Sequence, residues 1–584
     1  MEIRAVRELV WVKYKEMSMD YRIGKVAAVT GAEVFISIAD YAGGDAPSGV
    51  PASMTVDLPS DGGPVPLLIG QPGTFVLVSL PHSYLLCMVT GIEMKEERVS
   101  ANDLKQAGTE SVLLTDRVSR SISTVPVGTV SASGSFERGT DVLPTVNAPV
   151  FAVDSFLVEK IYSGYAEGDF SLGRLSLIPA QTAKINLDAF LTRHAAILGQ
   201  TGGGKSWTVA SVVQKICQFP QSTVVLFDLH GEYTNAFGEY AEVIPASDLE
   251  LPYWLMNSEE LLGLMVDRSE SAAPNQIAKF KELLQEGKAG VKENQDLKLP
   301  KITIDTPVYF DFQSLIDKFR ALDTEMVSGA RGEKQGPLFG QFTRLLMRID
   351  SRLNDRRYDL IFKPKKYATS ASMDELFRRI LGEGSGDQKK VVVVDLSSTP
   401  FDVRTPVISL ILRCLFDFSY WYRRVNKGGV YPISVFADEA HIYLSDLDAS
   451  SSAARESAER IAKEGRKYGI SLTVISQRPR EVSSTILSQC GSFLCLRISN
   501  PDDQSYVKNL LPDSVRGISS MFSTLRRGEA ILLGDSVMMP TRIRIDPPDP
   551  RPASDDASFS EAWSRDPVEL DVGAVLSAWR AQEV

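Results

Sequence analysis

The phosphate-binding loop consensus, Gly199-Gln-Thr-Gly-Gly-Gly-Lys205-Ser206, constrains the fold of this 584-residue chain more than any other feature. It matches G-x-x-x-x-G-K-[ST] in full. The apolar residues 195–198 before it predict a strand, and residues 206–213 after it predict a helix. Such a loop turns its backbone N–H groups around nucleotide phosphates, while its lysine contacts the β and γ phosphates and its serine binds Mg²⁺. The pattern therefore predicts a P-loop domain that binds ATP or GTP with Mg²⁺.

The composition is that of a multi-domain globular protein. A chain of 584 residues exceeds one hydrophobic core, so about two to four domains are expected. No apolar run approaches the ~20 residues that span a bilayer, and the first residues lack a signal-peptide pattern, so a cytoplasmic location is expected. The five cysteines form no C-x-x-C pair, which predicts reduced core residues. The net charge of −11 argues against a surface that is basic throughout and binds nucleic acid over its whole area. A basic lining that is restricted to a pore remains compatible with this charge.

Residues 1–165 predict a small N-terminal β-barrel. The segments 22–29, 33–38, 74–79 and 84–91 alternate partly between apolar and polar residues and are separated by turn residues. Residues 110–165 predict further strands, and the stretch from about 40 to 65 is rich in loop-forming residues.

From about residue 166, strands and helices alternate, which predicts an α/β domain with a mostly parallel sheet and a RecA-like P-loop ATPase core. The core covers 166–250 and 386–546, with strand candidates at 195–198, 223–227, 391–395, 433–437, 471–475, 493–497 and 529–533. Residues 251–385 predict a helical-bundle insertion, in which Phe342, Leu345, Leu346, Ile349 and Leu353 share one helical face. Residues 547–584 predict a C-terminal tail that is either disordered or docked on a neighbouring subunit.

Two adjacent carboxylates, Asp438 and Glu439, follow the apolar stretch 433–437. Asp438 is the predicted Mg²⁺ ligand, acting through water. Glu439 is the candidate general base that polarises the attacking water. Such a pair alone also fits a solvated strand end, but its position downstream of a full phosphate loop favours catalysis.

Two further strand ends carry polar side chains. Asp228 and Glu232, in Asp228-Leu-His-Gly-Glu-Tyr233, could orient Mg²⁺, water or residues of a neighbouring subunit, and the alternative is a polar turn. Gln477, in Ser476-Gln-Arg-Pro479, is a candidate sensor of the γ-phosphate or the lytic water, and the alternative is a capped strand end. His194, His230 and His441 flank these motifs, and a role in orienting loops is expected for them rather than metal binding.

A phosphoryl-transfer transition state gains stability from an inserted guanidinium group. Arg193 precedes the strand that leads to the phosphate loop, and Arg466 lies in Ala462-Lys-Glu-Gly-Arg466. Each is a candidate for acting on the nucleotide of a neighbouring subunit, and each equally fits a surface arginine. Arg478 and Arg404 are weaker candidates.

Together these motifs resemble those of HerA, in the HerA/FtsK superfamily of ring-forming ATPases. The order and spacing agree across 185–500, and the segments that carry the resemblance are His194 to Ser206, Asp228 to Tyr233, Asp438 to His441, Glu464 to Gly469 and Ser476 to Pro479. The expected nucleotide-binding set is Gly199, Gln200, Thr201, Gly202, Gly203, Gly204, Lys205, Ser206 and Trp207, with Asp228 and Glu232.

The resemblance implies a homo-hexamer with ATP and Mg²⁺ at each subunit interface. One subunit would supply Lys205, Ser206, Asp438, Glu439 and Gln477, and its neighbour would supply Arg193 or Arg466. It also implies double-stranded DNA in the central pore and a separate effector docked on the N-terminal barrel, such as a NurA-like nuclease, a sirtuin-like NADase or another nuclease.

Two functions of different classes follow. The first is an ATP-driven DNA translocase or helicase that works with such an effector in DNA end processing or antiphage defence. The second is a ring scaffold whose ATPase assembles and controls the effector without depending on DNA translocation. A conjugation or chromosome-segregation pump is disfavoured, because such pumps normally carry membrane segments.

Overall fold

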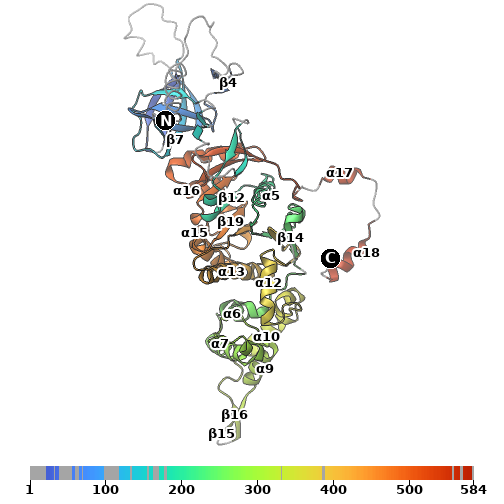
Figure 1. Ribbon diagram of the computed structural model, residues 1–584. Coiled ribbons are helices and arrows are strands. Elements are labelled where there is room, and N and C mark those ends of the chain that lie inside the picture. The colour runs from blue at the N-terminus through green and yellow to red at the C-terminus, as the bar shows by residue number, and fades with distance from the viewer. Residues whose placement is uncertain are drawn as a thin grey trace, which may run out of the picture.

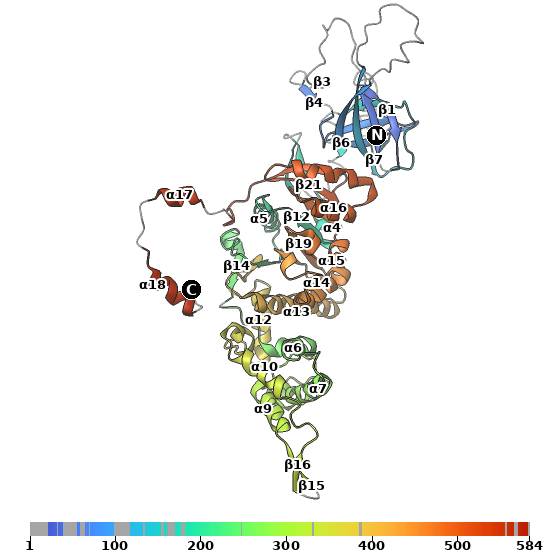
Figure 2. The ribbon, with the colours of Figure 1, turned by 180° about the vertical axis from the view of Figure 1, so that it is seen from behind.

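The computed structural model arranges the chain as a β-barrel, an α/β body and a helical insertion that ends in a hairpin (Figures 1 and 2). It describes residues 22–31, 33–38, 55–58, 65–68, 70–97, 117–131, 135–153, 157–158, 160–161, 170–176, 181–246, 248–329, 332–384, 388–554, 558–565 and 570–581. The predicted fold class is confirmed: an α/β core carries an N-terminal barrel and a helical insertion.

The barrel closes because β2 pairs with both β1 and β7, so that six strands form a ring in the order β2-β1-β9-β5-β6-β7. Its apolar interior is made by alternate residues such as Val26, Val34 and Ile122. Closure leaves no free sheet edge in the ring, which is how small all-β domains avoid edge pairing. The strands are β1 (Arg22–Val29), β2 (Val34–Ile38), β5 (Phe75–Ser79), β6 (Ser83–Glu97), β7 (Arg117–Ser131) and β9 (Pro149–Ala152), with β8 (Phe136–Arg138) appended to β7.

Within the stretch expected to be loop-rich, β3 (Thr55–Leu58) and β4 (Val65–Leu68) pair as a short hairpin. The rest of that stretch, up to residue 64, lies outside the described residues.

An eleven-stranded sheet forms the core, in the order β11-β10-β22-β21-β20-β12-β19-β18-β13-β17-β14. The seven strands from β20 to β14 are mutually parallel, and β21, β22, β10 and β11 extend the sheet antiparallel. The parallel strands are β12 (Ala195–Leu198), β13 (Val224–Asp228), β14 (Ala241–Pro245), β17 (Val391–Asp395), β18 (Ile433–Ala437), β19 (Ile470–Ser476) and β20 (Ser492–Cys495). The antiparallel strands are β10 (Ser171–Leu175), β11 (Thr182–Lys184), β21 (Glu529–Gly534) and β22 (Thr541–Ile545).

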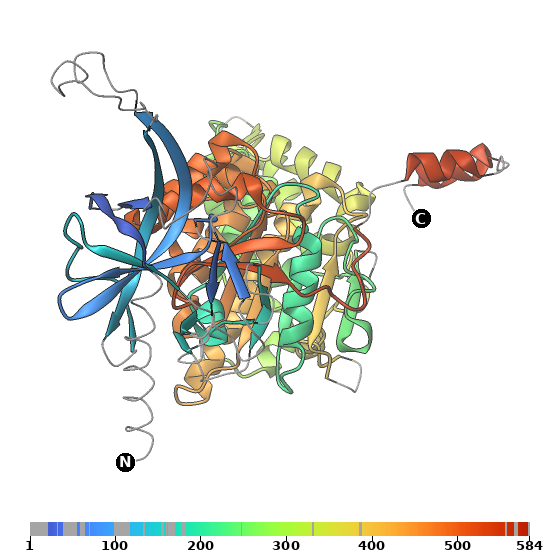
Figure 3. The same cartoon turned by 90° about the horizontal axis from the view of Figure 1, so that it is seen from above.

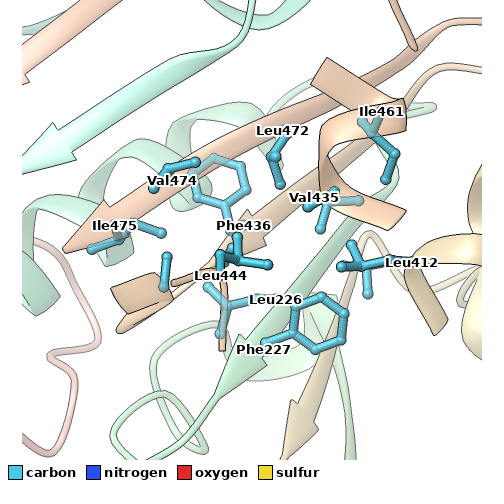
Figure 4. Close-up of a cluster of buried hydrophobic side chains, with 14 of the residues drawn as sticks. Leu226, Phe227, Leu412, Val435, Phe436, Leu444, Ile461, Leu472, Val474 and Ile475 are labelled. Carbon is cyan, nitrogen blue, oxygen red and sulfur yellow. The ribbon is translucent and has the colours of Figure 1, made fainter. Parts of the chain in front are cut away.

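Helices bury the central strands on both faces, which is why these strands are apolar along their whole length. Figure 4 shows Leu226 and Phe227 of β13, Val435 and Phe436 of β18, and three residues of β19 packed with side chains of the neighbouring helices. The core helices are α4 (Leu187–Thr192), α5 (Lys205–Ile216), α13 (Phe401–Val425), α14 (Ser452–Glu464), α15 (Ser484–Gln489) and α16 (Pro501–Leu510), with the 3₁₀ segment η10 (Asp513–Thr524) packed against β7 of the barrel.

The insertion leaves the sheet after β14 and returns at β17. Leu345, Leu346 and Ile349 of α10 are buried, as expected from their shared face. Arg413 of α13 donates hydrogen bonds to Glu260 (2.8 Å) and to the Leu255 carbonyl (2.7 Å), which joins the insertion to the core. The elements are α6 (Ser258–Met265), α7 (Ala273–Gly290), α8 (Lys292–Asp296), α9 (Phe312–Asp323), the hairpin β15 (Met326–Gly329) and β16 (Gly332–Gln335), α10 (Thr343–Leu353), α11 (Asp359–Phe362) and α12 (Met373–Ile380).

After β22 the chain crosses α5 and ends in α17 (Phe559–Ser564) and α18 (Val572–Ala581), and α18 stands apart from the body (Figure 3). All five cysteines are free and buried, as predicted. In the part of the chain that the structure describes, no helix is both long and apolar enough to span a membrane.

Candidate nucleotide-binding site

The phosphate loop connects the buried strand β12 to the start of α5, in the predicted order. Gly202 (φ 73°) and Gly204 (φ 98°) adopt left-handed conformations that side chains disfavour. At Gly203 an added Cβ would lie 2.9 Å from the Gln200 carbonyl oxygen, so no side chain fits there. The backbone N–H of Gln200 donates to the Arg497 carbonyl (2.9 Å), which ties the loop to the end of β20. The loop therefore has the open backbone that close approach of phosphates requires.

The other predicted motifs meet the loop at one edge of the sheet. Strands β12, β19, β18 and β13 are adjacent and parallel, so the residues that follow them converge there. Lys205, Gln477, Asp438 and Asp228 come from these four strand ends. Ligands of open parallel sheets bind outside the carboxyl ends of the strands.

Lys205 and Glu439 form a buried ion pair. The Lys205 Nζ lies 3.3 Å from Glu439 Oε1, and both side chains are about nine-tenths buried. Glu439 has φ 45°, a strained conformation for a residue with a side chain. The His441 Nδ1 lies 3.3 Å from Glu439 Oε2 and 3.4 Å from the Ser476 hydroxyl oxygen, and burial lowers the pKa of His441. The backbone strain, the lysine and the imidazole hold the Glu439 carboxylate at the mouth of the loop.

Asp438 lies directly behind this pair. The Tyr233 hydroxyl donates to its Oδ2 (3.1 Å), and the Glu439 backbone N–H donates to its Oδ1 (2.9 Å). Burial, reinforced by the negative charge of Glu439, raises the pKa of Asp438 to about 8. The carboxyl group therefore holds a proton at neutral pH unless a cation stabilises its charge.

Asp228 organises its own turn. Its Oδ1 accepts the backbone N–H groups of His230 (3.2 Å), Gly231 (2.8 Å) and Glu232 (3.2 Å), and its Oδ2 accepts that of Tyr233 (2.9 Å). The side chain is fully buried, and burial raises its pKa while these donors oppose the shift. Both carboxylate oxygens of Asp228 therefore already accept backbone hydrogen bonds, whereas the side chain of Glu232 is partly exposed. Nucleotide binding by either residue stays a prediction.

Gln477 lies beside the phosphate loop. Its Oε1 accepts a hydrogen bond from the Thr201 hydroxyl, which joins the end of β19 to the loop. Gln200, on the other side, accepts the Ser499 backbone N–H (3.0 Å) at its Oε1. Both loop side chains are therefore held by neighbouring strand ends.

The two candidate arginines lie away from the loop of their own chain. Arg193 precedes β12 and Arg466 precedes β19, so both lie at the amino-terminal edge of the parallel strands, opposite the phosphate loop. Arg193 pairs with Asp535 at 2.5 Å, and Arg138 of the barrel lies 3.6 Å from the same aspartate. Arg466 is exposed. Neither arginine can reach the phosphates in its own subunit, so a catalytic role requires a second copy.

His194 makes a structural contact between two strands. His194 accepts the Leu472 backbone N–H at Nδ1 (3.0 Å), and burial lowers its pKa to about 4, so it fastens β12 to β19 as a neutral ring. No cluster of three histidine, cysteine or acidic side chains suited to a metal occurs among the described residues.

The oxygen groups at the mouth of the loop fit Mg²⁺. This cation prefers oxygen ligands and keeps several of its waters, so it needs few protein groups. Ser206 is the second residue of α5, directly after Lys205, and the Lys205 Nζ lies 3.3 Å from Oε1 of Glu439, the residue that follows Asp438. The buried Glu439 Oε2 accepts no hydrogen bond from the described residues and has only the 3.3 Å contact with the His441 ring, which leaves this carboxylate oxygen able to accept a metal-bound water.

Sequence reasoning placed Trp207 in the nucleotide set but missed its neighbours. The guanidinium carbons of Arg527 and Arg551 lie 5.9 Å and 5.1 Å from the centre of the indole ring. Both arginines are more than 300 residues away in the sequence, and no local pattern connects them to the loop.

Comparison with known proteins gives one family and several relatives. Residues 170–415 match the family model described as the central domain of helicase HerA. The chain is 28% identical over 410 residues to the DNA double-strand break repair helicase HerA of Saccharolobus solfataricus, covering 70% of this chain and 74% of that protein. It is 26% identical over 460 residues to the protein of the same name from Pyrococcus furiosus, covering 72% and 77%. Among solved structures, the plasmid coupling protein TrwB in complex with ADP and Mg²⁺ matches at 13% identity and a TM-score of 0.41, covering 66% of this chain and 91% of that one.

Proposed function

We propose, from the match of residues 170–415 to the HerA central-domain model and the 28% identity to a HerA helicase, that this HerA-like chain is an ATP-hydrolysing motor that moves on double-stranded DNA. The observation that supports this most directly is the convergence of Lys205, Ser206, Asp438, Glu439 and Gln477 at one edge of the parallel sheet. These residue types are those that bind, hydrolyse and sense a nucleoside triphosphate in P-loop enzymes.

In this proposal the loop glycines and Lys205 hold the β and γ phosphates, and Ser206 and Asp438 hold Mg²⁺, which neutralises phosphate charge when bound. Glu439 orients and polarises the attacking water. It is suited to this task because strained backbone, Lys205 and His441 fix its carboxylate. Gln477 acts as the sensor of the γ-phosphate and couples it to β19, because its side chain contacts the phosphate loop at Thr201 and its backbone directly follows that strand.

We further propose a ring, a homo-hexamer, in which Arg193 or Arg466 reaches the nucleotide of the next subunit. The support is their position at the edge opposite the loop of their own chain. A guanidinium group supplied in trans commonly accelerates phosphoryl transfer.

A separate effector, a nuclease or an NADase-type enzyme, would dock on the N-terminal barrel. The connection from β8 to β9 exposes Val142, Leu143 and Val146, and an exposed apolar surface of this kind favours a protein partner. The same surface supports the second candidate, a ring that assembles an effector in antiphage defence without needing DNA.

ATP hydrolysis by the full chain, measured across a titration of linear duplex DNA, tests the proposal. Lys205→Ala serves as the blank. Stimulation by DNA that fades with added salt supports the motor, because phosphate-backbone contacts are salt-sensitive. A rate unmoved by DNA favours the scaffold, and equal rates for wild type and Lys205→Ala contradict the active-site assignment.

A mixing experiment tests the shared site. Lys205→Ala and Arg466→Ala subunits are each expected to be inactive alone. Mixed rings contain interfaces with an intact loop facing an intact arginine, so activity should return on mixing. The same mixing experiment is done with Lys205→Ala and Arg193→Ala subunits. If activity returns in neither mixture, the proposal that an arginine acts on the neighbouring subunit is contradicted.

A further inference from the structure

Trp207 lies at the border of the phosphate loop, one residue after Ser206 in the first turn of α5. Its ring is partly exposed, and its indole N–H is buried with no hydrogen-bond acceptor among the described residues. A buried donor without an acceptor is costly, and such exceptions often mark a place where a ligand supplies the acceptor.

The turn that carries Arg527 packs directly on the loop. The Gly528 backbone N–H lies 3.4 Å from the Gly203 carbonyl oxygen, and a Cβ added at Gly204 would lie 3.3 Å from the Gly528 nitrogen. Arg527 is therefore fixed beside the phosphate loop, and its guanidinium lies over the Trp207 ring.

A second arginine arrives on the segment 546–554, which we call the strap. Lys215 binds Asp546 of the strap (2.5 Å), and Gln214 both donates to the Pro550 carbonyl (2.8 Å) and accepts the Asp549 N–H (2.9 Å). Because Gln214 and Trp207 are seven residues apart on α5, they share one face of the helix. The strap therefore runs along that face from the end of α5 towards Trp207.

The far end of the strap is fastened to another part of the site. The Ala553 N–H donates to the Glu232 carbonyl (2.7 Å), in the turn that Asp228 organises. Arg551 lies between these anchors, is exposed, and covers the Trp207 ring at 5.1 Å. Neither Arg551 nor Arg527 has an ion pair with a described carboxylate, so both guanidinium planes are available to a ligand.

We propose that Trp207, Arg527 and Arg551 form the subsite for the nucleobase of the bound nucleotide, with the strap as its outer wall. This rests on the proposed ATPase function and adds the base-recognition element to it. An aromatic ring and two guanidinium planes recognise a planar base chiefly by stacking, and the buried indole N–H of Trp207 is a donor for an acceptor atom of the ligand. The subsite therefore favours purines over pyrimidines and accepts ATP and GTP alike.

Calorimetric titration of the full chain with ATP, GTP, UTP and inorganic tripolyphosphate, all with Mg²⁺, tests this. Arg551→Ala and Arg527→Ala are each expected to weaken ATP and GTP binding roughly five- to thirtyfold, the range of one lost stacking contact, and to leave tripolyphosphate binding unchanged. Arg551→Lys should fail to restore affinity, because an ammonium has no plane to stack. The matched control, Arg565→Ala directly after α17, removes an exposed arginine outside the site and should leave the binding of all four ligands unchanged.

Equal loss of ATP and tripolyphosphate binding, or rescue by Arg551→Lys, would assign the arginines to phosphate and overturn the nucleobase subsite. Unchanged ATP binding in both alanine variants would also overturn it while the proposed ATPase stands. If wild type and Lys205→Ala bind ATP equally, the proposed function itself fails, which separates the two failures.

Discussion

Replacing Asp228 by asparagine should loosen the turn at 230–233 rather than remove a nucleotide contact. In the native turn one carboxylate accepts four backbone N–H groups. Asparagine has the same shape but only one acceptor oxygen. If that oxygen keeps the three donors now on Oδ1, the amide nitrogen faces the Tyr233 N–H, and that buried donor loses its acceptor.

The size of the effect follows from these contacts. A buried backbone donor left without an acceptor costs about 1–3 kcal/mol. The three remaining hydrogen bonds lose their charge assistance, which roughly halves their strength. Together these effects lower the local opening free energy of the turn by about 2–4 kcal/mol. Amide hydrogen exchange should accelerate by roughly 30- to 1000-fold if exchange follows local opening.

Hydrogen exchange at the four amides, read by mass spectrometry, measures this directly. The matched control is Asp395→Asn, because Asp395 is the register partner of Asp228 on β17 and, among the described residues, its side chain accepts a single backbone N–H, that of Ser397 (2.9 Å). That variant should change exchange in the 230–233 turn by less than about threefold. If Asp228→Asn exchanges these amides at the wild-type rate and also loses ATP binding, the structural role is refuted and Asp228 is assigned to nucleotide binding instead.

Three further outcomes are expected. Glu439→Gly and Glu439→Ala should both lose hydrolysis, but the glycine variant should be more stable by about 1 kcal/mol, because only glycine accepts φ 45° without strain; equal denaturation curves would contradict this. Burial raises the pKa of Asp438 to about 8 in the folded chain, whereas its ordinary value is 3.8, so between these values the folded state binds a proton that the unfolded state releases. In EDTA, the thermal stability of the wild type should therefore fall relative to that of Asp438→Asn as the pH rises from 5 to 9. Parallel pH profiles of the two proteins would argue that Asp438 is ionised throughout. Gly204→Ala should destabilise the chain by about 1–2 kcal/mol and weaken ATP binding, because the left-handed φ of 98° disfavours a side chain. Gly263→Ala, in α6 where an added Cβ meets no atom, should stabilise the chain by about 0.5–1 kcal/mol. Thermal denaturation measures both changes, and a shift of the same sign in the two variants would contradict the prediction.

The sequence predicted what local patterns encode. Buried parallel strands are apolar throughout, so the strands that end at Leu198, Asp228 and Ala437 were recognisable, and so were the polar residues that follow them. Their convergence then follows from parallel topology. The closed barrel was similarly readable from its short alternating strands.

What the sequence could not predict depends on contacts between distant segments. Strand β10 pairs with β22, and the two are separated by more than 360 residues, so nothing near Ser171 indicates its partner. The ion pair of Arg193 with Asp535 and the approach of Arg551 to Trp207 are of the same kind. The role of Asp228 is open for a different reason, because an acidic residue at a strand end has the same sequence pattern whether it faces a ligand or its own turn.

The place where the insertion enters the sheet has a consequence for how such proteins can diverge. Strands β14 and β17 are parallel neighbours, so the chain between them must cross over from one end of the sheet to the other, which takes about a dozen residues at least. The insertion occupies that obligatory connection. Since the closure entropy of a connection grows only with the logarithm of its length, extending it roughly twelvefold costs about 2 kcal/mol. Evolution could therefore lengthen, shorten or exchange the whole helical body at little thermodynamic expense to the catalytic sheet.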